Sequence, residues 1–507
     1  MKKTTRRIAR TTAALAAALA LAAPMTVQPA AEIGTIIAYA ATPSSTDLIN
    51  DIAAHPENYF EVSSTKNEDG CYSITGFKKP AKYQYVPLTT LTIPAKIGSK
   101  VITRVEKPSS QRYGRAICDN DVTSIVISNG IIGLGYDTIV DCPNLRTVTL
   151  PSSIQILKYR SFSSCPSLTK IKVSSNLLNF ENGFVSGCPN MKDAWSEKAA
   201  YLMIKNGMSI MTINDSPIIR DIGADHKPVM SSVLEAALRN NYDLLDGTEL
   251  MDTYLRIYSR YLLKNTIGIN SSMTFNQKVK KIYQYVIPRV TYDHDAFSWE
   301  YNSSGGIIGE KRGGSQKPYS SGAIFFSNKA VCSGYTKGLN YLFREAGITS
   351  YSVHEDDQVR YADGTIHDGG HAFNLLSYNN MFFIVDATCG NSAYLMNIPE
   401  EKVGHNVESV YNWEFYTPDD SRIYLDYTKI KYALGDVNGD QRVDNADAPI
   451  MREYINASAS QKASIAARYN KTKAQMDCLC DADCDGVLNS SKDTLAQWNL
   501  QSRFKFR

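Results

Sequence analysis

Residues 139–150 read IVDCPNLRTVTL, and residues 162–173 repeat the pattern as FSSCPSLTKIKV, with a further copy, VSGCPNM, at residues 185–191. The cysteines that mark this period, spaced by 24, 23 and 23 residues, are Cys118, Cys142, Cys165 and Cys188. A period in the twenties with alternating apolar residues is typical of a solenoid that adds a strand in every turn. We therefore expect each cysteine to be a small buried thiol stacked on the next coil, without a disulfide.

Outward from this stretch, the pattern continues over roughly Tyr83 to Met191 and includes Leu-Pro-Ser-Ser-Ile at 150–154. It resembles the BspA-like leucine-rich repeats of bacterial surface proteins. The resemblance implies a β-rich solenoid over residues 83–195, with residues 41–82 as its N-terminal segment or cap. For the repeats we favour a spacer or a packing partner for the next domain. The alternative is a concave face that binds a partner protein or a glycan.

Beyond the repeats, a group of three residues predicts thiol chemistry. They are Cys332, His371 and Asp386. Cys332 opens an amphipathic pattern that ends at Gly347, so it falls in the first turn of a helix, where backbone amides and the helix dipole favour a thiolate. Two asparagines at 379–380 predict the turn of a hairpin. In that register His371 and Asp386 are diagonal neighbours on one face, within side-chain reach. A carboxylate can then orient an imidazole that serves the thiolate.

Each of these residues also has an ordinary structural explanation, as a buried thiol, a core histidine or a turn cap. The helix start, the hairpin register and the residue types agree, and we therefore favour the joint interpretation. The surrounding segment, from about Thr274 to Thr388, resembles transglutaminase-like (papain-like) domains of the bacterial type. The matching stretches are VTYD at 290–293, YSSGA at 319–323, VCSGY at 331–335, HAFN at 371–374 and VDAT at 385–388.

By this resemblance Cys332 is the nucleophile, His371 the base and Asp386 the orienting acid of an α+β domain over residues 230–432, after a linker at 196–229. Phe373 and Cys389 stand where the family usually carries tryptophan, which leaves the pocket shape open. Gln316 is a weak candidate for the oxyanion donor, and the backbone amide of Cys332 is a stronger one.

Members of this family include peptidases, amide-forming cross-linkers and proteins without activity. We favour a cysteine peptidase or amide acyl-transferase that acts on a protein substrate. Between these two we favour peptidase-type hydrolysis, because water is the default acceptor of a thioester. The alternative is a non-catalytic component in which the repeats and a degenerate domain bind a protein or a glycan. The sequence contains no paired-carboxylate motif that would indicate a polysaccharidase.

Two acidic loops near the end of the chain predict calcium sites at the spacing of an EF-hand loop. The first is GDVNGDQRVDNAD at 435–447, in which Gln441 replaces the usual glycine of position 6. The second starts at Asp481 and reaches Asp493 one residue late. The predicted ligands are Asp436, Asn438, Asp440, Arg442, Asp444 and Asp447 in the first loop, and Asp481, Asp483, Asp485, Asn489 and Asp493 in the second.

Two loop–helix units at 434–504 resemble a type I dockerin, here assigned to residues 433–507 as a small α-helical, EF-hand-like domain. The resemblance implies folding on structural Ca²⁺ and binding to the cohesin module of a scaffoldin on a cellulosome. By the family pattern, loop positions 10 and 11 recognise cohesin, and they map to Asn445, Ala446, Ser490 and Ser491. For Cys478, Cys480 and Cys484 we favour a local disulfide over a zinc site, because no nearby histidine completes one.

The length of 507 residues fits about three domains, and the net charge of +3, from 54 Lys and Arg against 51 Asp and Glu, argues against a nucleic-acid binder. The first residues are basic, and an Ala/Leu run follows from Ala13 to Ala23. This pattern predicts a signal peptide over residues 1–40, with cleavage near Ala40 or nearer Ala31. No later segment resembles a membrane span. We expect a secreted, extracellular protein associated with a cellulosome or the cell surface.

Overall fold

The computed structural model describes residues 42–107, 114–174, 177–388, 407–417, 421–425, 433–440 and 442–501. The predicted signal peptide lies outside the described residues. Residues 1–43 and 44–507 form two separate units, and the second contains every element below.

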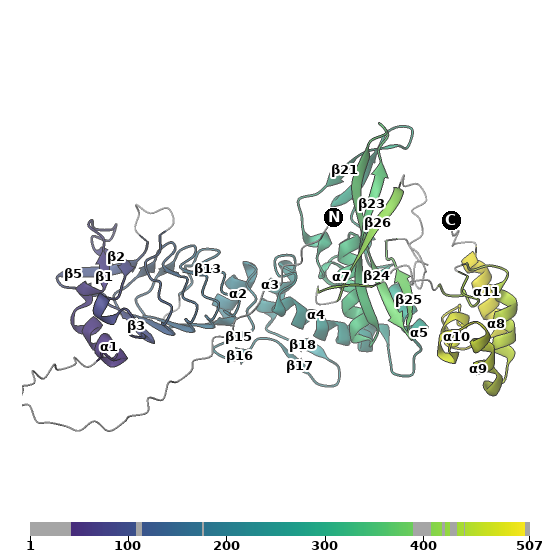
Figure 1. Ribbon diagram of the computed structural model, residues 1–507, viewed down its shortest axis with the longest axis horizontal. Coiled ribbons are helices and arrows are strands. Elements are labelled where there is room, and N and C mark those ends of the chain that lie inside the picture. The colour runs from purple at the N-terminus through teal and green to yellow at the C-terminus, as the bar shows by residue number, and fades with distance from the viewer. Residues whose placement is uncertain are drawn as a thin grey trace, which may run out of the picture. The chain divides into compact units, whose positions relative to one another are not determined.

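Parallel strands in successive coils build the repeat region (Figure 1). One face is the four-stranded sheet β12–β9–β6–β3, in which Val148 pairs with Ile125 on one side and Ile171 on the other. Its strands are β3 Thr90–Ile93, β6 Ser124–Ile127, β9 Thr147–Leu150 and β12 Lys170–Val173. Alternate residues of these strands are buried, as expected when one face of each coil turns inward.

Two further sheets complete the coils. The strands of the first are β5 Lys100–Val105, β7 Gly133–Leu134 and β10 Ile156–Leu157, extended by β1 Phe60–Val62, β2 Tyr72–Phe77 and β4 Lys96–Ile97. Those of the second are β8 Ile139–Val140, β11 Phe162–Ser163 and β13 Val185–Ser186. Helix α1 Ser45–Ala54 precedes the solenoid and buries Leu48 and Ile52.

The repeated cysteines are free thiols, as predicted, and all but Cys118 are buried. The Cys142 thiol lies 3.9 Å from the carbonyl of Ile117, and the Cys165 thiol lies 3.8 Å from that of Ile139. Each thiol therefore points to the coil before it. The neighbouring Cys142 side chain is the largest cause that raises the pKa of Cys165, to about 12.

The stretch 196–229, predicted as a linker, instead contains regular structure. Its elements are α2 Glu197–Lys205, β15 Thr212–Ile213, β16 Ser216–Pro217, β17 Arg220–Ile222 and β18 Lys227–Val229, after β14 Asp193–Ala194. Helix α2 buries Ala199 and Met203, and it packs against the next helix, α3 Ser232–Asn240. The apolar spacing on α2 explains why this stretch folds onto its neighbours and is no extended connection.

The region that carries Cys332 combines helices with a five-stranded antiparallel sheet of order β25–β24–β23–β26–β27. Its helices are α4 Glu249–Leu262, a π-helical turn at Leu263–Ile267, α5 Phe275–Val286, α6 Ala323–Phe326 and α7 Cys332–Glu345. Its strands are β19 Thr291–Tyr292, β20 Phe297–Tyr301, β21 Ile307–Arg312, β22 Lys329–Ala330, β23 Thr349–Arg360, β24 Ile366–Tyr378, β25 Met381–Val385, β26 Val407–Tyr416 and β27 Arg422–Ile423.

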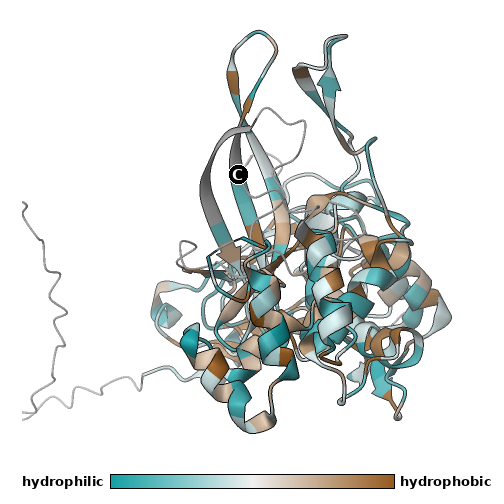
Figure 2. Cartoon of the chain, turned by 90° about the vertical axis from the view of Figure 1, so that its right-hand side faces the viewer, coloured by the Kyte–Doolittle hydropathy of each residue, from teal (hydrophilic) through white to brown (hydrophobic). Residues whose placement is uncertain are grey.

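The predicted hairpin register is confirmed. Tyr378 pairs with Met381, and Asn379 and Asn380 adopt φ of 48° and 61°, the left-handed geometry that a two-residue hairpin turn requires. Helix α7 packs on β24 and β23. The β20–β21 and β23–β24 hairpins project from this region (Figure 1), and hydrophilic and hydrophobic residues mix along the helices that face the viewer in Figure 2.

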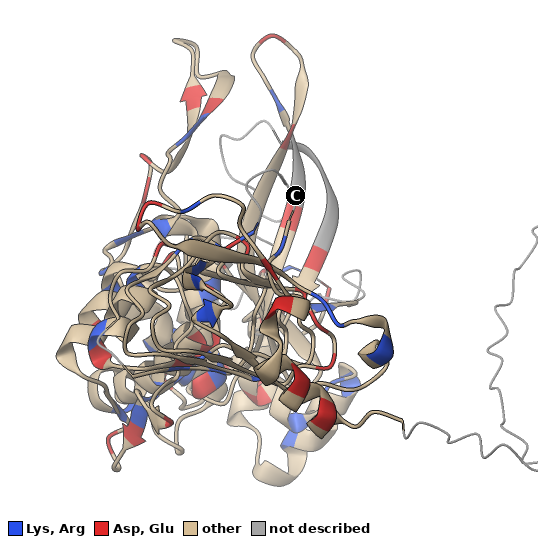
Figure 3. Cartoon of the chain, turned by 90° about the vertical axis from the view of Figure 1, so that its left-hand side faces the viewer, with Lys and Arg blue, Asp and Glu red and all other residues tan. Residues whose placement is uncertain are grey.

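The described residues of the tail form four helices, α8 Asp447–Asn456, α9 Ala459–Arg468, α10 Lys473–Cys480 and α11 Ser490–Gln501. Helix α11 packs against α8, so the two loop–helix units share a core that includes Met451 and Leu479. Over the whole chain, basic and acidic positions are interspersed along the backbone (Figure 3), in keeping with the small net charge. Among the described helices, none combines the length and apolar character needed to cross a membrane.

Candidate functional site

Cys332 is the first residue of α7, as the sequence predicts. Val331 precedes it as the N-cap in an extended conformation, and no side chain caps this end of the helix. The Thr336 hydroxyl donates to the Cys332 carbonyl at 2.8 Å. A Cβ at Gly334 would lie 2.1 Å from the Pro318 carbonyl oxygen, so only glycine allows this close approach of the preceding turn.

His371 and Asp386 form a buried pair. The Nε2 atom of His371 lies 2.6 Å from Oδ2 of Asp386, and their side chains are 5% and 1% exposed. The other carboxylate oxygen accepts hydrogen bonds from the Thr388 amide at 2.9 Å and the Thr388 hydroxyl at 2.6 Å. The Tyr283 hydroxyl donates to the Asp386 carbonyl at 3.1 Å. These contacts fix the carboxylate and, through it, the imidazole plane.

A buried polar network joins the helix of Cys332 to the strand of His371. The Asn374 amide group donates to the Thr336 carbonyl at 3.0 Å and to Oδ1 of Asn340 at 2.8 Å. Asn340 in turn donates to the Ser352 hydroxyl at 2.7 Å and accepts from Ser350 at 2.6 Å. Because buried donors and acceptors are costly to leave unpaired, this network fixes how α7, β24 and β23 sit together.

Two tyrosines near Cys332 carried no role in the sequence prediction. Strand pairing places Tyr292 beside Ala330, two residues before Cys332. Burial is the largest cause that raises the Tyr292 pKa, and the charges of Cys332, Tyr319 and Asp386 raise it further. Tyr319 donates to the Ala296 carbonyl at 3.0 Å. Both residues occur in the quoted motifs, but their distance from Cys332 in sequence hides their proximity.

Gln316, the weaker oxyanion candidate, is exposed and precedes the 3-10 turn Lys317–Tyr319. The other candidate, the backbone amide of Cys332, lies at the start of α7. Cys389 lies outside the described residues.

The second calcium loop brings its carboxylates together. One oxygen from each of Asp481, Asp483 and Asp485 lies within 4.8 Å of the others. Asp493 is fully buried, and its carboxylate accepts from the amides of Asn489 at 2.7 Å and Asp483 at 3.4 Å. This grouping of oxygen atoms is compatible with a hard cation such as calcium.

The two loops place their last acids equivalently despite the extra residue. In the first loop Asp447 accepts from the Asp444 amide at 2.9 Å, just as Asp493 accepts from Asn489 in the second. Both acids lie in the first turn of a helix. Helix α11 begins at Ser490, before the last acid of its loop, and the extra residue is absorbed there.

The first loop is held by its own turns. Asp436 is buried and accepts from the Gly439 amide at 2.7 Å, while Asn438 donates to Asp440 at 3.1 Å and Asp440 accepts from the Arg442 amide at 2.9 Å. Gln441 lies outside the described residues.

A lysine lies against the first loop, which the sequence analysis did not anticipate. Lys471 is only 8% exposed, and its Nζ atom lies 2.7 Å from the point that a Cβ at Gly439 would occupy. Burial lowers the Lys471 pKa, and the charges of Asp436 and Asp447 oppose that shift.

The acids of both loops fit a cation. Burial raises the pKa of Asp447 to about 7 and that of Asp481 to about 7. A buried carboxylate is stabilised in its charged form by a bound cation. Calcium at these oxygens would supply that charge, so the donor set and its burial fit the ion.

The predicted cohesin contacts lie where the loops meet their helices. Asn445 and Ala446 are exposed just before α8, and Ser491 is exposed while Ser490 is half-buried at the start of α11. The favoured local disulfide is wrong. Its three cysteines are free, buried thiols: Cys478, Cys480 and Cys484.

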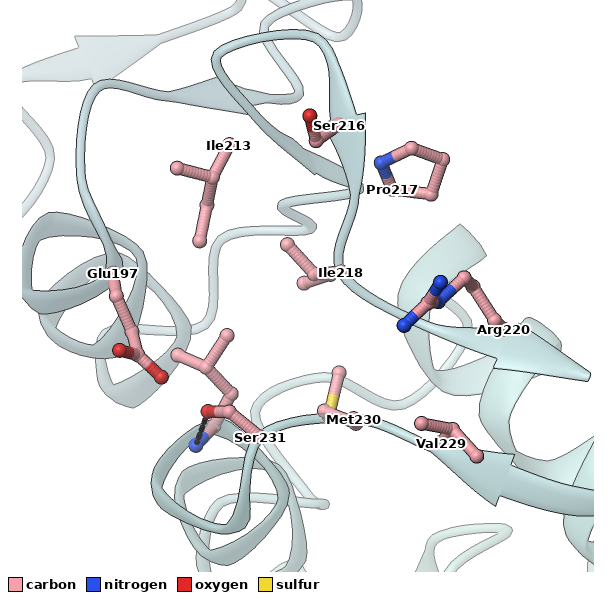
Figure 4. Close-up of a pocket in the computed structure, with 10 residues that line it drawn as sticks. Glu197, Ile213, Ser216, Pro217, Ile218, Arg220, Val229, Met230 and Ser231 are labelled. Atoms are coloured by element: carbon pink, nitrogen blue, oxygen red, sulfur yellow. Dashed lines mark hydrogen bonds between the residues drawn. The ribbon is translucent and has the colours of Figure 1, made fainter.

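A pocket of about 480 Å³ lies between α2, β15–β18 and the start of α3 (Figure 4). Ile213, Ile218 and Met230 give it apolar walls, and Glu197 and Arg220 carry its charges. The residues that line it include no cysteine or histidine. It therefore offers an apolar recess without the thiol and imidazole that the Cys332 hypothesis needs.

Comparison with known families supports both ends of the described chain. Residues 115–208 match the BspA type leucine rich repeat region in six copies, and residues 434–492 match the dockerin type I domain. The chain thus contains BspA-type leucine-rich repeats and a type I dockerin domain. The dockerin indicates anchoring to a cellulosome through a cohesin, and the repeats suggest binding. Calcium binding is a general property of type I dockerins.

Three solved structures are similar over part of their length. A leucine-rich repeat protein from Bacteroides ovatus ATCC 8483 is 18% identical, with 31% of this chain and 36% of that chain covered and a TM-score of 0.21. Pneumococcal vaccine antigen PcpA is 18% identical, with coverages of 30% and 44% and a TM-score of 0.19. A leucine rich cell surface protein from Faecalibacterium prausnitzii A2-165 is 16% identical, with coverages of 32% and 55% and a TM-score of 0.18. The matches span less than two thirds of each structure. No curated protein matches the chain.

Proposed function

We propose that this chain is an extracellular, cellulosome-associated thiol enzyme of the papain-like or transglutaminase-like class. It would cleave or transfer amide bonds of a protein substrate, while its tail holds it to a scaffoldin cohesin. The observation that carries the proposal is the buried His371–Asp386 pair, with Nε2 and Oδ2 2.6 Å apart, in a domain whose Cys332 opens α7.

In this proposal each of the three residues has one role. Asp386 engages Nε2 of His371, so Nδ1 is the nitrogen that would take the proton from the Cys332 thiol. The thiolate attacks the amide carbonyl, His371 returns the proton to the leaving amine, and a thioester remains. Water or a second amine then resolves the thioester. The Cys332 amide would donate to the oxyanion.

Alkylation tests this proposal directly. We expect iodoacetamide to modify Cys332 faster in the native protein than in the denatured protein, and Cys332→Ala to remove that fast label. Cys71, a half-buried thiol in the repeat cap, is the matched control, and Cys71→Ala should leave the fast label intact. Native Cys332 that reacts no faster than denatured Cys332 would overturn the assignment.

The reaction type needs a second measurement. The full chain and its Cys332→Ala variant are incubated with a protein mixture, and mass spectrometry sorts the products into cleaved and cross-linked peptides. Cleavage lost in the variant supports a peptidase, and new isopeptide bonds lost in the variant support an acyl-transferase. Identical products from both chains contradict either activity.

For the anchoring, Asn445 and Ala446 are the exposed residues that we assign to cohesin contact. Calorimetry with scaffoldin cohesins, with and without calcium, measures it. We expect binding only with calcium, and loss of binding when both loops lose their last acid, Asp447 and Asp493. Heat that is absent with every cohesin would refute the docking role.

A second function, binding by the repeats, is favoured by a shallow groove of about 490 Å³ along the coils. Asp141, Ser164 and Gly187 repeat one left-handed backbone geometry there, with φ of 55°, 52° and 64°. Pro143 and Pro166 add rigid apolar contacts. We expect Cys332→Ala to leave the binding of a protein or cell-wall glycan unchanged. We expect Ser164→Arg to abolish that binding. Unchanged binding by Ser164→Arg would exclude this groove.

A further inference from the structure

Helix α5 of the Cys332 region contacts the second calcium loop through a buried asparagine. Asn276 is 1% exposed, and its amide group donates to the carbonyls of Cys478 at 2.8 Å and Asp481 at 3.0 Å. Its Oδ1 atom lies 3.1 Å from the Cys478 thiol, which donates to it. Every polar atom of this side chain therefore has a partner, and the partners are in the tail.

The next residues of the same helix extend the contact along the loop. Gln277 donates to the carbonyl of Asp485 at 2.5 Å, and Lys280 donates to the carbonyl of Asp483 at 2.5 Å. The Gln277 side chain also fills the space where a Cβ at Gly486 would stand. Three side chains of α5 thus each donate to a different backbone carbonyl of the loop. Asn276 donates to Asp481, Lys280 to Asp483 and Gln277 to Asp485.

The same three loop residues present their side chains to one another. Asp481, Asp483 and Asp485 give their backbone carbonyls to α5 and converge their carboxylates within 4.8 Å. The side chains of α5 donate hydrogen bonds to the backbone of the loop, so the carboxylates of the same residues remain available to bind a cation. A loop held in this way loses less conformational entropy when it binds the ion.

We propose that α5 is an intramolecular docking surface for the second calcium loop, so that calcium binding in that loop and docking of the tail on the Cys332 region strengthen each other. The coupling is reciprocal. If docking increases the calcium affinity of the loop, bound calcium must increase the docking equilibrium constant by the same factor. The proposal depends on the calcium assignment of the tail and is independent of the thiol chemistry of Cys332.

The test uses the full chain with Asp447→Ala, which leaves the second loop to be measured by calcium calorimetry. Asn276→Leu keeps the number and branching of the side-chain heavy atoms, adds no charge, and removes two N–H donors and one acceptor oxygen. We expect about tenfold weaker calcium binding, since each lost hydrogen bond contributes a few-fold. Gln284→Leu is the matched control, because Gln284 is exposed on the same helix, and it should bind calcium as the parent does.

Hydrogen exchange of the unaltered chain supplies a second measurement that needs no variant. Calcium should slow amide exchange in α5 several-fold, while exchange in α4, which does not carry these contacts, stays constant. Equal calcium affinity for Asn276→Leu and its parent would overturn the proposal, and so would α5 exchange that ignores calcium. If the second loop binds no calcium, both the docking proposal and the calcium assignment are wrong. The alkylation of Cys332 tests the enzyme proposal independently of that result.

Discussion

Lys471→Met tests how the first calcium loop balances its charges. Lys471 is nearly buried beside Gly439, within reach of the charges of Asp436 and Asp447. Without an ion, its ammonium is a positive charge that interacts with both of these buried acids. Methionine has a similar length and no charge, so the substitution removes the electrostatic role and keeps most of the packing.

The size of the effect follows from the repulsion between calcium and the ammonium. A divalent and a monovalent cation about 6 Å apart repel by about 1.4 kcal/mol in water and about 5.5 kcal/mol at an effective dielectric of about 20. The lysine stem is flexible and lets the ammonium move outward, so we take the low end. Lys471→Met should therefore bind calcium in the first loop about tenfold more tightly.

The same substitution has the opposite effect on the calcium-free protein. Asp436 and Asp447 are fully buried, and the loss of their positive neighbour leaves charge uncompensated. Removing one partner of a buried ionic arrangement typically costs about 3 kcal/mol of unfolding free energy. We expect the calcium-free tail to melt at a lower temperature and calcium to restore more stability than it does in the parent.

Calcium calorimetry and thermal unfolding, with and without a chelator, measure both effects in an Asp481→Ala background that disables the second loop. Lys473→Met is the control, because Lys473 is half-exposed and pairs with Asp477 away from the loop. Such exposed pairs contribute little, so its calcium affinity should stay at the parent value. Weaker or unchanged calcium binding by Lys471→Met would refute the competition between ammonium and ion.

Three further predictions use other parts of the chain. Asp386→Asn keeps the size of the side chain but removes the charge that orients His371, and it should slow the native alkylation of Cys332 at least tenfold, as followed by mass spectrometry; an unchanged rate would separate the pair from the thiol. Cys165→Ala removes a buried thiol and its contacts with the Ser163 and Ile139 carbonyls, and should lower the unfolding free energy of the repeats by about 1–3 kcal/mol in urea melts, whereas Cys165→Ser, whose hydroxyl can donate to the same carbonyls, should cost less. The raised pKa of Asp447, about 7, means that the folded tail holds protons that the unfolded chain releases near pH 4; calcium-free stability should fall as pH rises from about 4 to about 7, and a melting temperature that rises over that window would contradict the shift.

Local signals explain what the sequence could predict. The hairpin register depends on two adjacent asparagines in left-handed geometry, and the start of α7 depends on apolar spacing that begins after Cys332. The repeat is visible in the sequence because every coil buries the same types of residue at equivalent positions. In each case the determining contacts lie within a few residues or one period of each other, and a pattern in one segment is enough.

The missing parts are contacts between segments far apart in the chain. Lys471 follows α9 and reads as one more polar loop residue, and only the folded tail brings it to Gly439. Tyr292 is 40 residues before Cys332 and reaches its surroundings through the β19–β22 pairing. Asn276 and Gln277 look like a polar helix start, and Gln277 does cap it by accepting from the Thr274 amide. Both residues also donate to carbonyls of the tail, which are 202 and 208 residues away in the sequence. No local pattern predicts contacts over that distance.

Buried asparagines hold both sites of this chain in the same physical manner. Asn374 fixes the strand of His371 to the helix of Cys332, and Asn276 fixes α5 to the second calcium loop. An apolar contact tolerates a small slide because dispersion has little direction, but a displaced asparagine leaves its donors unpaired at about 1–3 kcal/mol for each group. A thiol and imidazole that must exchange a proton, and carboxylates that must share one ion, both need positions fixed within a fraction of an ångström. The polar contacts are therefore best understood as positioning devices, and replacing Asn374 by leucine should loosen the thiol site more than it lowers the stability of the fold.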